Sequence, residues 1–332
     1  MKQFTSIALV ECWFGPFPAW HDLYLRTCAA NPTVQWIIFH DAPVPKRRPE
    51  NVRFVHLTKE DFVCRISRVL NRPFVLTSGH KACDFKPAFG AIFADFLADF
   101  SFWGYNDSDL FWGDIRHFIT EELLANHDII TGCRTSIVGQ FTLFRNAGVT
   151  REVHTLISDY PNKIVTSKTE HLDEGELDHA VSVKGLRICR RQLQVHDENA
   201  PEWEQMARQL EMEEKGNLDE WFWEGGPCLW KEGHLTHIAT GKETMFFHFR
   251  TWKYHWRENG LLHRLAYRDA FLEGFTITRQ GMRLRFKPQW FLLEACSRGL
   301  HGIRRGVFYC GRAMERVKRI PRGIMRRFSV VR

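Results

Sequence analysis

The chain has 332 residues, of which 44% are hydrophobic and 26% charged, and its formal net charge is +7. This hydrophobic fraction is ample for a packed globular core, and a single α/β domain with a tail fits the length. No run of about eighteen consecutive apolar residues occurs, which excludes an ordinary transmembrane helix.

The cysteine pattern and the N-terminus exclude two further classes of protein. Nine cysteines are scattered without a close C-x-x-C pair, which speaks against a zinc knuckle or a disulfide framework and suits a reducing cytosol. The N-terminal apolar run is interrupted by Glu11 and lacks a small-residue cleavage site, so we expect no signal peptide.

The positive charge is concentrated at the C-terminus. Residues 298–332 contain eleven Lys and Arg residues and one acid, Glu315, a local net charge of +10 that leaves −3 for residues 1–297. The basic character therefore belongs to a tail and not to the body of the protein.

The first half of the chain alternates segments of strand and helix character. Strands are expected at 6–14, 34–41, 51–58 and 102–107, and helices at 18–30, at 58–70 and at 84–100. Thr58 and Asp61 match a helix N-cap signature. Such alternation predicts a mostly parallel sheet flanked by helices, in which ligands bind beyond the carboxyl ends of the strands, where Asp41 and Asp107 lie.

The segment 84–100 shows the clearest helical periodicity. Its large apolar residues recur at spacings of three and four, which predicts one buried face. These residues are Phe89, Ile92, Phe93, Phe96, Leu97 and Phe100.

The second half is less regular. A helix at 115–126 with Asp114 as its cap, strands at 127–132 and 139–146, a helix at 151–157, and antiparallel strands at 228–238 and 243–250 are expected. The charged segment 201–223 is expected to be an exposed insertion, because its acids and bases are closely mixed.

The stretch "FWGYNDSDLFWGD" places three carboxylates among aromatic residues. After a buried strand, Asp107 and Asp109 would point to the same side, and their hard oxygens could hold Mg²⁺ or Mn²⁺ together with phosphate oxygens. The alternative is that "NDSD" is an ordinary turn. The apolar neighbours on both sides would exclude water, which favours the metal site.

Four runs carry a resemblance to a known family. They are "KACDFKPAFGAIFADFLADFSFWGYNDSDLFWGDI", "GQFTLFRN", "HLDEGELDHAV" and "ETMFFHFRTWK". Over roughly residues 5–255 the chain resembles the bacterial polysaccharide and lipopolysaccharide glycosyltransferases of the GT-A fold, whose Asp-x-Asp motif binds the nucleotide sugar. The first run is the specific one.

The resemblance implies a metal site and a donor site. Asp109 would bind the divalent ion, Asp107 the ribose or the metal, and His248 would complete the metal site. Without the resemblance, the favoured interpretation of His248, which is flanked by phenylalanines, is a core histidine.

For the donor nucleotide, the resemblance implies contacts from Lys86 and from the end of the first strand at Trp13. Asp41, at the end of the second strand, is placed with them. Lys86 is otherwise an ordinary lysine near a helix N-terminus, where its charge is unfavourable. Trp13 could equally be part of the core.

Asp173 and Glu174 are the candidates for contact with the acceptor hydroxyl or the reacting sugar, since proton removal needs a carboxylate within hydrogen-bond reach. The alternative is a helix start, where acidic residues favour the helix dipole.

The tail interleaves basic with apolar residues, which predicts an amphipathic basic helix attracted to an anionic membrane surface. A solvated or disordered tail is the alternative. Nucleic acid is not expected as a partner, because no nucleic-acid fold or stacking platform accompanies the tail.

We therefore expect an α/β, GT-A-like domain at 1–255 and a basic helical extension at 256–332. Residues 1–146 would bind the donor, and 147–255, with the insertion near 200–223, would bind the acceptor and complete the metal site. The expected function is transfer of a sugar from a nucleotide diphosphate, a UDP-sugar in the first instance, with Mn²⁺ or Mg²⁺.

The acceptor would be a bacterial surface glycan or glycolipid, at the cytoplasmic face of the cell membrane. Two alternatives stay open. One is a phosphohydrolase with an Asp-x-Asp nucleophile, although that motif belongs on a first strand and here three strands precede it. The other is a nonenzymatic membrane or nucleic-acid adaptor that acts through the tail.

Overall fold

The structure is a computed structural model that describes residues 4–76, 80–166, 168–196, 226–258 and 272–286. Its contacts divide the chain into two compact units. The first comprises Met1–Ala266 and Thr276–Arg283, and the second comprises Tyr267–Phe275 and Leu284–Arg332. The division runs through β13 (Leu272–Thr278) and β14 (Gly281–Phe286). The expected insertion near 200–223 and the expected basic helical tail lie outside the described residues.

A seven-stranded sheet forms the centre of the first unit, with the order β3-β2-β1-β4-β7-β6-β8. Its strands are β1 (Ile7–Trp13), β2 (Val34–His40), β3 (Val52–His56), β4 (Phe102–Asn106), β6 (Ile129–Thr131), β7 (Phe141–Arg145) and β8 (Ile188–Arg190). Within this sheet β7 runs antiparallel to both of its neighbours, and all the other pairings are parallel. The expected α/β fold with a mostly parallel central sheet is confirmed.

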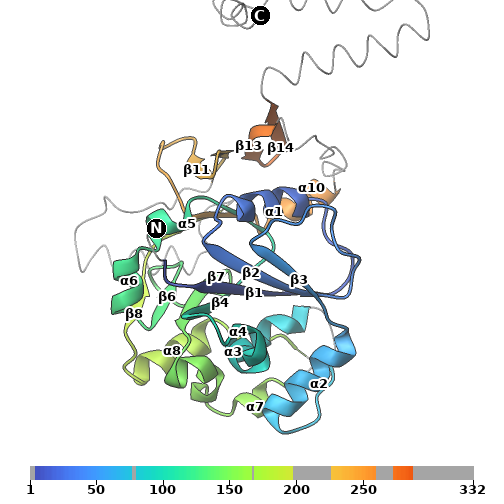
Figure 1. Cartoon of the computed structure of the whole chain (residues 1–332), viewed down its shortest axis with the longest axis vertical. Helices are drawn as coiled ribbons and strands as arrows, with labels where there is room; N and C mark the ends of the chain where they lie inside the picture. The colour runs from blue at the N-terminus through green and yellow to red at the C-terminus, as the bar shows by residue number, and fades with distance from the viewer. Residues whose placement is uncertain (1–3, 77–79, 167, 197–225, 259–271, 287–332) are drawn as a thin grey trace, which may run out of the picture. The chain divides into compact units, whose positions relative to one another are not determined.

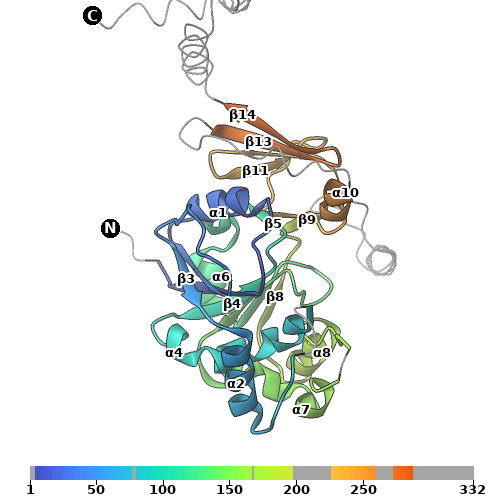
Figure 2. The same ribbon diagram turned by 90° about the vertical axis from the view of Figure 1, so that its right-hand side faces the viewer.

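Helices cover both faces of this sheet (Figure 1, Figure 2). On one face lies α1 (His21–Ala29). The other face carries α2 (Lys59–Leu70), α3 (Phe89–Ile92), α4 (Ala94–Leu97), α7 (Tyr160–Lys163) and α8 (Gly175–Val183). The α2 helix begins as expected, because the Thr58 side chain accepts a hydrogen bond from the Asp61 amide. Coverage on both faces explains why β4 is buried along its whole length.

The expected single helix at 84–100 is wrong in its backbone, although its apolar face is buried. The chain forms a 3₁₀ helix, η1 (His80–Ala88), followed by the short helices α3 and α4. Pro87 lies inside η1 and disfavours an α conformation at the residue before it. At Gly90 the backbone passes so close to η2 (Gly148–Leu156) that a Cβ atom would lie 2.3 Å from the Arg151 carbonyl oxygen.

Two other expected helices also differ. The segment 115–126 forms α5 (Ile115–Phe118) and α6 (Glu121–Asn126), because Thr120 adopts an extended conformation and caps a new helix. Asp114 caps α5 as expected, accepting hydrogen bonds from the Arg116 and His117 amides. The expected helix at 151–157 is the 3₁₀ helix η2.

A second, three-stranded sheet has the order β5-β12-β9. It contains β5 (Leu110–Trp112), β9 (Gln194–His196) and β12 (Phe246–His248). The β12 strand pairs antiparallel with β5 and parallel with β9. The single strand expected at 228–238 is instead an antiparallel pair, β10 (Cys228–Lys231) and β11 (His234–His237), and β12, within the strand expected at 243–250, does not pair with it. After β12 comes α10 (Trp252–Glu258). Pairing of β12 with β5 brings the region around residue 248 back to the end of β4.

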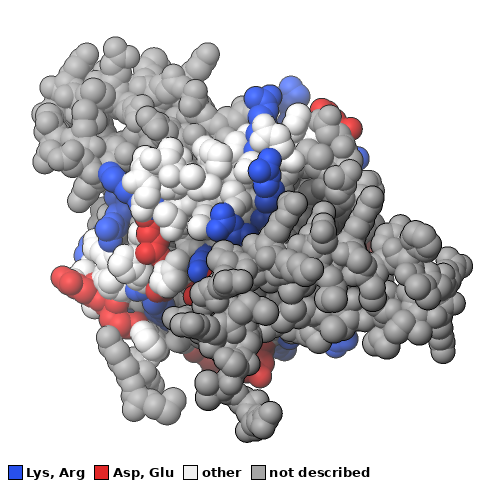
Figure 3. Space-filling view, turned by 90° about the horizontal axis from the view of Figure 1, so that it is seen from above, with Lys and Arg blue, Asp and Glu red and all other residues white. Residues whose placement is uncertain are grey.

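Two further observations concern the surface charges and the helices of the described residues. Figure 3 shows both basic and acidic side chains exposed among uncharged ones. Among the described residues, no helix combines the length and the apolar character that crossing a membrane requires.

A buried carboxyl group in β1 generates a stability prediction. Glu11 is 4% exposed, and burial raises its pKa from 4.5 to about 7. The folded protein therefore keeps a proton that the unfolded chain releases, so the free energy of unfolding falls as the pH rises from 4.5 to about 7.

We expect Glu11→Gln, which is neutral at every pH, to become more stable relative to the wild type across this window. The gain should reach on the order of 3 kcal/mol above about pH 8, measured by urea unfolding at a series of pH values. The exposed Glu50→Gln serves as the control. A difference that does not change with pH would contradict the expectation.

Candidate metal and donor site

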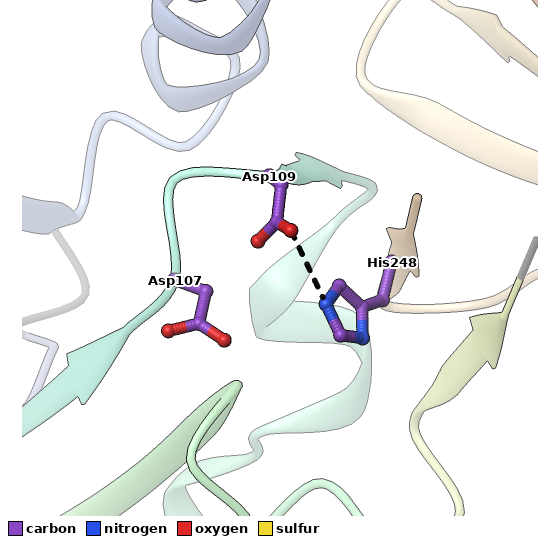
Figure 4. A group of neighbouring side chains, drawn as sticks. All are labelled: Asp107, Asp109 and His248. Atoms are coloured by element: carbon purple, nitrogen blue, oxygen red, sulfur yellow. Dashed lines mark ion pairs between the residues drawn. The ribbon is translucent and has the colours of Figure 1, made fainter. Parts of the chain in front are cut away.

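The end of β4 brings two carboxylates into the interior of the protein. After Asn106 the chain leaves the sheet through Asp107, Ser108 and Asp109 and then enters β5. His248 lies opposite Leu110 in the antiparallel pairing of β12 with β5, so its side chain comes beside Asp109. Figure 4 shows the three side chains pointing toward one another from these separate segments. One potential ligand atom from each of Asp107, Asp109 and His248 lies within 4.8 Å of the other two.

Asp109 is the most buried carboxylate of this cluster, at 5% exposure. Its Oδ2 atom lies 3.6 Å from His248 Nε2 and also contacts the Lys253 ammonium group of α10. Burial by itself would raise the pKa of Asp109, but His248 and Lys253 outweigh burial and hold this pKa well below its usual range. Asp109 is therefore an ionised carboxylate at neutral pH.

Lys86 connects the cluster to a third carboxylate. Its Nζ atom lies 2.7 Å from Asp107 Oδ1 and 3.1 Å from Asp173 Oδ2, and it donates to the Gly139 carbonyl oxygen at 2.8 Å. Burial opposes the charge of Lys86, but Asp107 and Asp173 outweigh it and raise the pKa of this ammonium group well above its ordinary value. An ordinary lysine near a helix N-terminus, which was the alternative for Lys86, would not make these three contacts.

Asp173 is 2% exposed, and its Oδ1 atom has no hydrogen-bond partner among the described residues. Burial raises the pKa of Asp173, and Lys86, which is shared with Asp107, offsets only part of this effect. Burial also raises the pKa of Glu174, and Asp173 adds to it. Glu174 is the N-cap residue of α8, yet its side chain makes no capping hydrogen bond.

A glycine makes the contact between Lys86 and Asp173 possible. A Cβ atom at Gly139 would lie 2.3 Å from Asp173 Oδ2 and 3.2 Å from Lys86 Nζ. A side chain at this position, two residues before β7, would therefore displace the Asp173 carboxylate or the Lys86 ammonium group.

A fully buried ion pair supports the segment that leads to Asp173. Lys81 Nζ lies 2.7 Å from Asp84 Oδ2, and both side chains are completely buried. Asp84 also accepts hydrogen bonds from the Glu170 and Leu172 amides. The η1 segment thus carries Lys86 and at the same time fixes the chain next to Asp173.

Two residues expected at the donor site, Trp13 and Asp41, make local hydrogen bonds. Trp13 is half-buried, and its indole nitrogen donates to the Pro16 carbonyl oxygen at 3.0 Å. Asp41 accepts a hydrogen bond of 2.6 Å from the Gly15 amide and so joins the loops after β1 and β2. Neither belongs to the Asp107, Asp109 and His248 cluster.

The same loops form a pocket of about 340 Å³. Its lining residues are Pro16, Phe17, Pro18, Ala19, His21, Asp22, Ala42, Pro43 and Pro45. Trp20, in the loop that lines it, donates from its indole nitrogen to the Ser108 carbonyl oxygen at 3.1 Å. The loop after β1 is therefore connected directly to the turn that carries Asp107 and Asp109.

The sequence reasoning missed Lys253, although the run "ETMFFHFRTWK" that ends on it was part of the resemblance. A signal was available, because a lysine in the first turn of a helix is placed unfavourably in the helix dipole. The contact with Asp109 explains this position. Gly139 gave no comparable signal, because Lys86 and Asp173, which it approaches, are remote from it in the sequence.

These observations define a mixed α/β protein with a carboxylate and histidine cluster at the carboxyl end of a central strand. The chain belongs to the Family of unknown function (DUF6625), whose model matches residues 9–280. Among the curated proteins no match is found.

Several solved structures are similar to the chain. A complex of the galactosyltransferase LgtC with donor and acceptor sugar analogues has 10% identity and a TM-score of 0.42, over 79% of this chain and 98% of that one. Mouse xyloside xylosyltransferase 1 has 9% identity and a TM-score of 0.41, over 74% and 98%. The glycosyltransferase GlyE of Streptococcus pneumoniae has 12% identity and a TM-score of 0.37, over 63% and 50%. Because these values are low, the chemistry has to be argued from the residues of this chain.

The contact of Lys253 with Asp109 leads to a prediction about cation binding. The ammonium group occupies the Asp109 oxygen that faces His248, and its positive charge repels a divalent cation. We expect Lys253→Met to bind Mn²⁺ about tenfold more tightly than the wild type in the absence of nucleotide, a difference of about 1.4 kcal/mol.

Titration of Mn²⁺ followed by electron paramagnetic resonance of the free ion measures this affinity. The matched control is Lys163→Met, a lysine paired with the exposed Glu176 on the protein surface, and its affinity for Mn²⁺ should stay unchanged. Equal or weaker binding by Lys253→Met would show that the ammonium group does not compete with the ion.

Proposed function

We propose that this protein is a metal-dependent glycosyltransferase that moves a sugar from a nucleotide-diphosphate donor to a glycan or glycolipid acceptor. The observation that carries the proposal is the cluster of Asp107, Asp109 and His248 beside two lysines at the carboxyl end of β4. Carboxylate oxygens suit Mg²⁺ and Mn²⁺, and the imidazole, a ligand of transition metals, favours Mn²⁺ of the two.

The charges around this cluster suit a diphosphate leaving group. A bound divalent ion held by Asp107, Asp109 and His248 would neutralise the negative charge that develops on the departing diphosphate. Lys86 and Lys253 add two ammonium groups to the same site, each paired with one of the carboxylates. A departing phosphate oxygen could take over part of these pairings, so the lysines would act in the transition state.

Asp173 and Glu174 are proposed to contact the acceptor hydroxyl or the reacting sugar. In the transfer, the acceptor oxygen forms a bond to the anomeric carbon, and the bond from that carbon to the diphosphate oxygen breaks. The proton of the acceptor hydroxyl passes to a carboxylate within hydrogen-bond reach. The Oδ1 atom of Asp173, which has no hydrogen-bond partner in the described part of the chain, and the raised pKa values of both groups support this role.

The pocket formed by the loops after β1 and β2 is proposed to take the base of the nucleotide. It lies at the carboxyl ends of parallel strands, where ligands of such sheets bind, and Phe17 offers an aromatic ring among its lining residues. Through Trp20 and Ser108 this loop is joined to the metal cluster. Trp13 and Asp41 would then act by shaping the loops around the nucleotide.

The finer parts of the proposal rest on the sequence. They are a UDP-sugar as donor, a bacterial surface glycan as acceptor, and attachment of the basic tail to the cytoplasmic face of the cell membrane. The division into a transferase domain at 1–255 and a basic extension at 256–332 belongs with them. The net charge of +10 in residues 298–332 supports the membrane part.

Nucleotide binding gives the first test. Thermal unfolding of the purified protein against a panel of nucleotide diphosphates, each with and without Mn²⁺, should show stabilisation by one of them that depends on the metal. A ligand at about 100 times its dissociation constant adds about 2.7 kcal/mol to stability. The shift should disappear in Asp109→Asn and persist in Asp99→Asn, an exposed control.

The outcome also separates the alternatives. Absence of any shift with a folded sample would oppose the transferase and favour an adaptor that acts through its tail. Release of inorganic phosphate from the nucleotides would favour a phosphohydrolase.

The role of Asp173 gives a second test. With the donor identified by the thermal shift, Asp173→Asn should keep metal-dependent nucleotide binding but lose transfer activity by about 10²- to 10⁴-fold, because the proton acceptor is gone. Glu174→Gln, its neighbour in the chain, is the matched comparison. Full activity in both variants would remove these two carboxylates from the mechanism.

A further inference from the structure

Three polar side chains form a buried, hydrogen-bonded group next to the turn that carries Asp107 and Asp109. They are Glu11 of β1, Tyr24 of α1 and Asn106 of β4, and they are 4%, 0% and 3% exposed. The Tyr24 hydroxyl donates to Glu11 Oε2 at 2.7 Å. The amide nitrogen of Asn106 donates to the Tyr24 hydroxyl oxygen at 2.9 Å and lies 3.4 Å from Glu11 Oε2. We call this group the Glu11 triad.

The Glu11 triad is connected to the metal cluster through the main chain. The side-chain amide of Asn106 also donates to the Asp107 carbonyl oxygen at 2.9 Å. Its two N–H groups are therefore used by Tyr24 and by Asp107. Because Asn106 is the last residue of β4, this pair of hydrogen bonds fixes the backbone at the point where it turns from the sheet toward Asp107 and Asp109.

Stability alone does not explain the Glu11 triad. Glu11 lies in a strand whose preceding residues, Leu9 and Val10, are completely buried, so an apolar side chain would suit its position. Glu11 Oε1 and Asn106 Oδ1 are buried and have no hydrogen-bond partner among the described residues, which is unfavourable. A buried polar group that is only partly satisfied is expected where position matters more than stability.

We propose that the Glu11 triad positions the turn between β4 and β5 so that the carboxylates of Asp107 and Asp109 are preorganised to bind a divalent cation. The three side chains are positioning residues, since they act through Asn106 and the Asp107 backbone. The proposal rests on the metal-binding part of the proposed function. It adds residues from β1 and α1 to a site whose proposed ligands come from β12 and the turn after β4.

Affinity for Mn²⁺ alone, measured on the full chain without nucleotide, tests the proposal. Tyr24→Phe keeps the ring and removes the hydroxyl group, and Glu11→Leu removes the carboxyl group. Both should weaken Mn²⁺ binding about 10- to 100-fold, as is typical when the residues that orient metal ligands are changed. Glu11→Gln still offers Tyr24 a hydrogen-bond acceptor and should bind Mn²⁺ as the wild type does.

A matched control separates positioning from general loss of stability. Asn51 is another buried amide, 5% exposed, and it donates to the carbonyl oxygens of Cys28, Asn31 and Val34. Asn51→Ala should lower the melting temperature without changing Mn²⁺ affinity. Wild-type affinity in Tyr24→Phe, or an equal loss in Asn51→Ala, would overturn the proposal.

Hydrogen exchange provides a readout that does not depend on metal. Without added metal, the amides of residues 106–112 should exchange faster in Tyr24→Phe and Glu11→Leu than in the wild type, whereas those of β2 should not change. Unchanged exchange at 106–112 would overturn the positioning role. If the two variants show this exchange pattern but the wild type binds no Mn²⁺, the positioning role stands and the metal part of the proposed function fails.

Discussion

The ammonium group of Lys86, shared between Asp107 and Asp173, is the interaction on which the rest of the site depends. It joins η1 to the turn after β4 and to the residue before α8, three segments that are far apart in the sequence. Two carboxylates this close would repel each other without a cation between them. The lysine therefore allows both to lie at one place, and Gly139 leaves the space in which they meet.

A second cation, the ammonium group of Lys253, pairs with Asp109. The site thus combines three carboxylates with two ammonium groups. Such an arrangement can accept a divalent ion together with a diphosphate, because the ion supplies positive charge and the diphosphate supplies negative charge. This combination of opposite charges is the physical reason for proposing a nucleotide-diphosphate donor.

The fold makes this arrangement rigid. The Asp84 and Lys81 pair fixes the chain before Asp173. The side chains of Trp20 and Asn106 donate hydrogen bonds to the backbone of the turn that carries Asp107. The 3₁₀ geometry of η1, which replaces the expected regular helix, follows from Pro87. The segment that contributes to the core also carries Lys86, a predicted donor-site residue, to Asp107 and Asp173.

The sequence by itself determined the elements that local patterns specify. These include the buried strands before Asp41 and Asp107, the Thr58 and Asp114 caps, and the apolar face of 84–100, because strand alternation, capping and helical spacing involve neighbouring residues. The Asp-x-Asp turn and His248 were identifiable through chemistry and resemblance. The tertiary structure decided which polar groups meet. Pairing of β12 with β5 brings Lys253 to Asp109, and Gly139 leaves room for Asp173 beside Lys86. Tyr24 links Glu11 to Asn106 by hydrogen bonds. Such contacts join residues far apart in the chain, and no local pattern carries information about them.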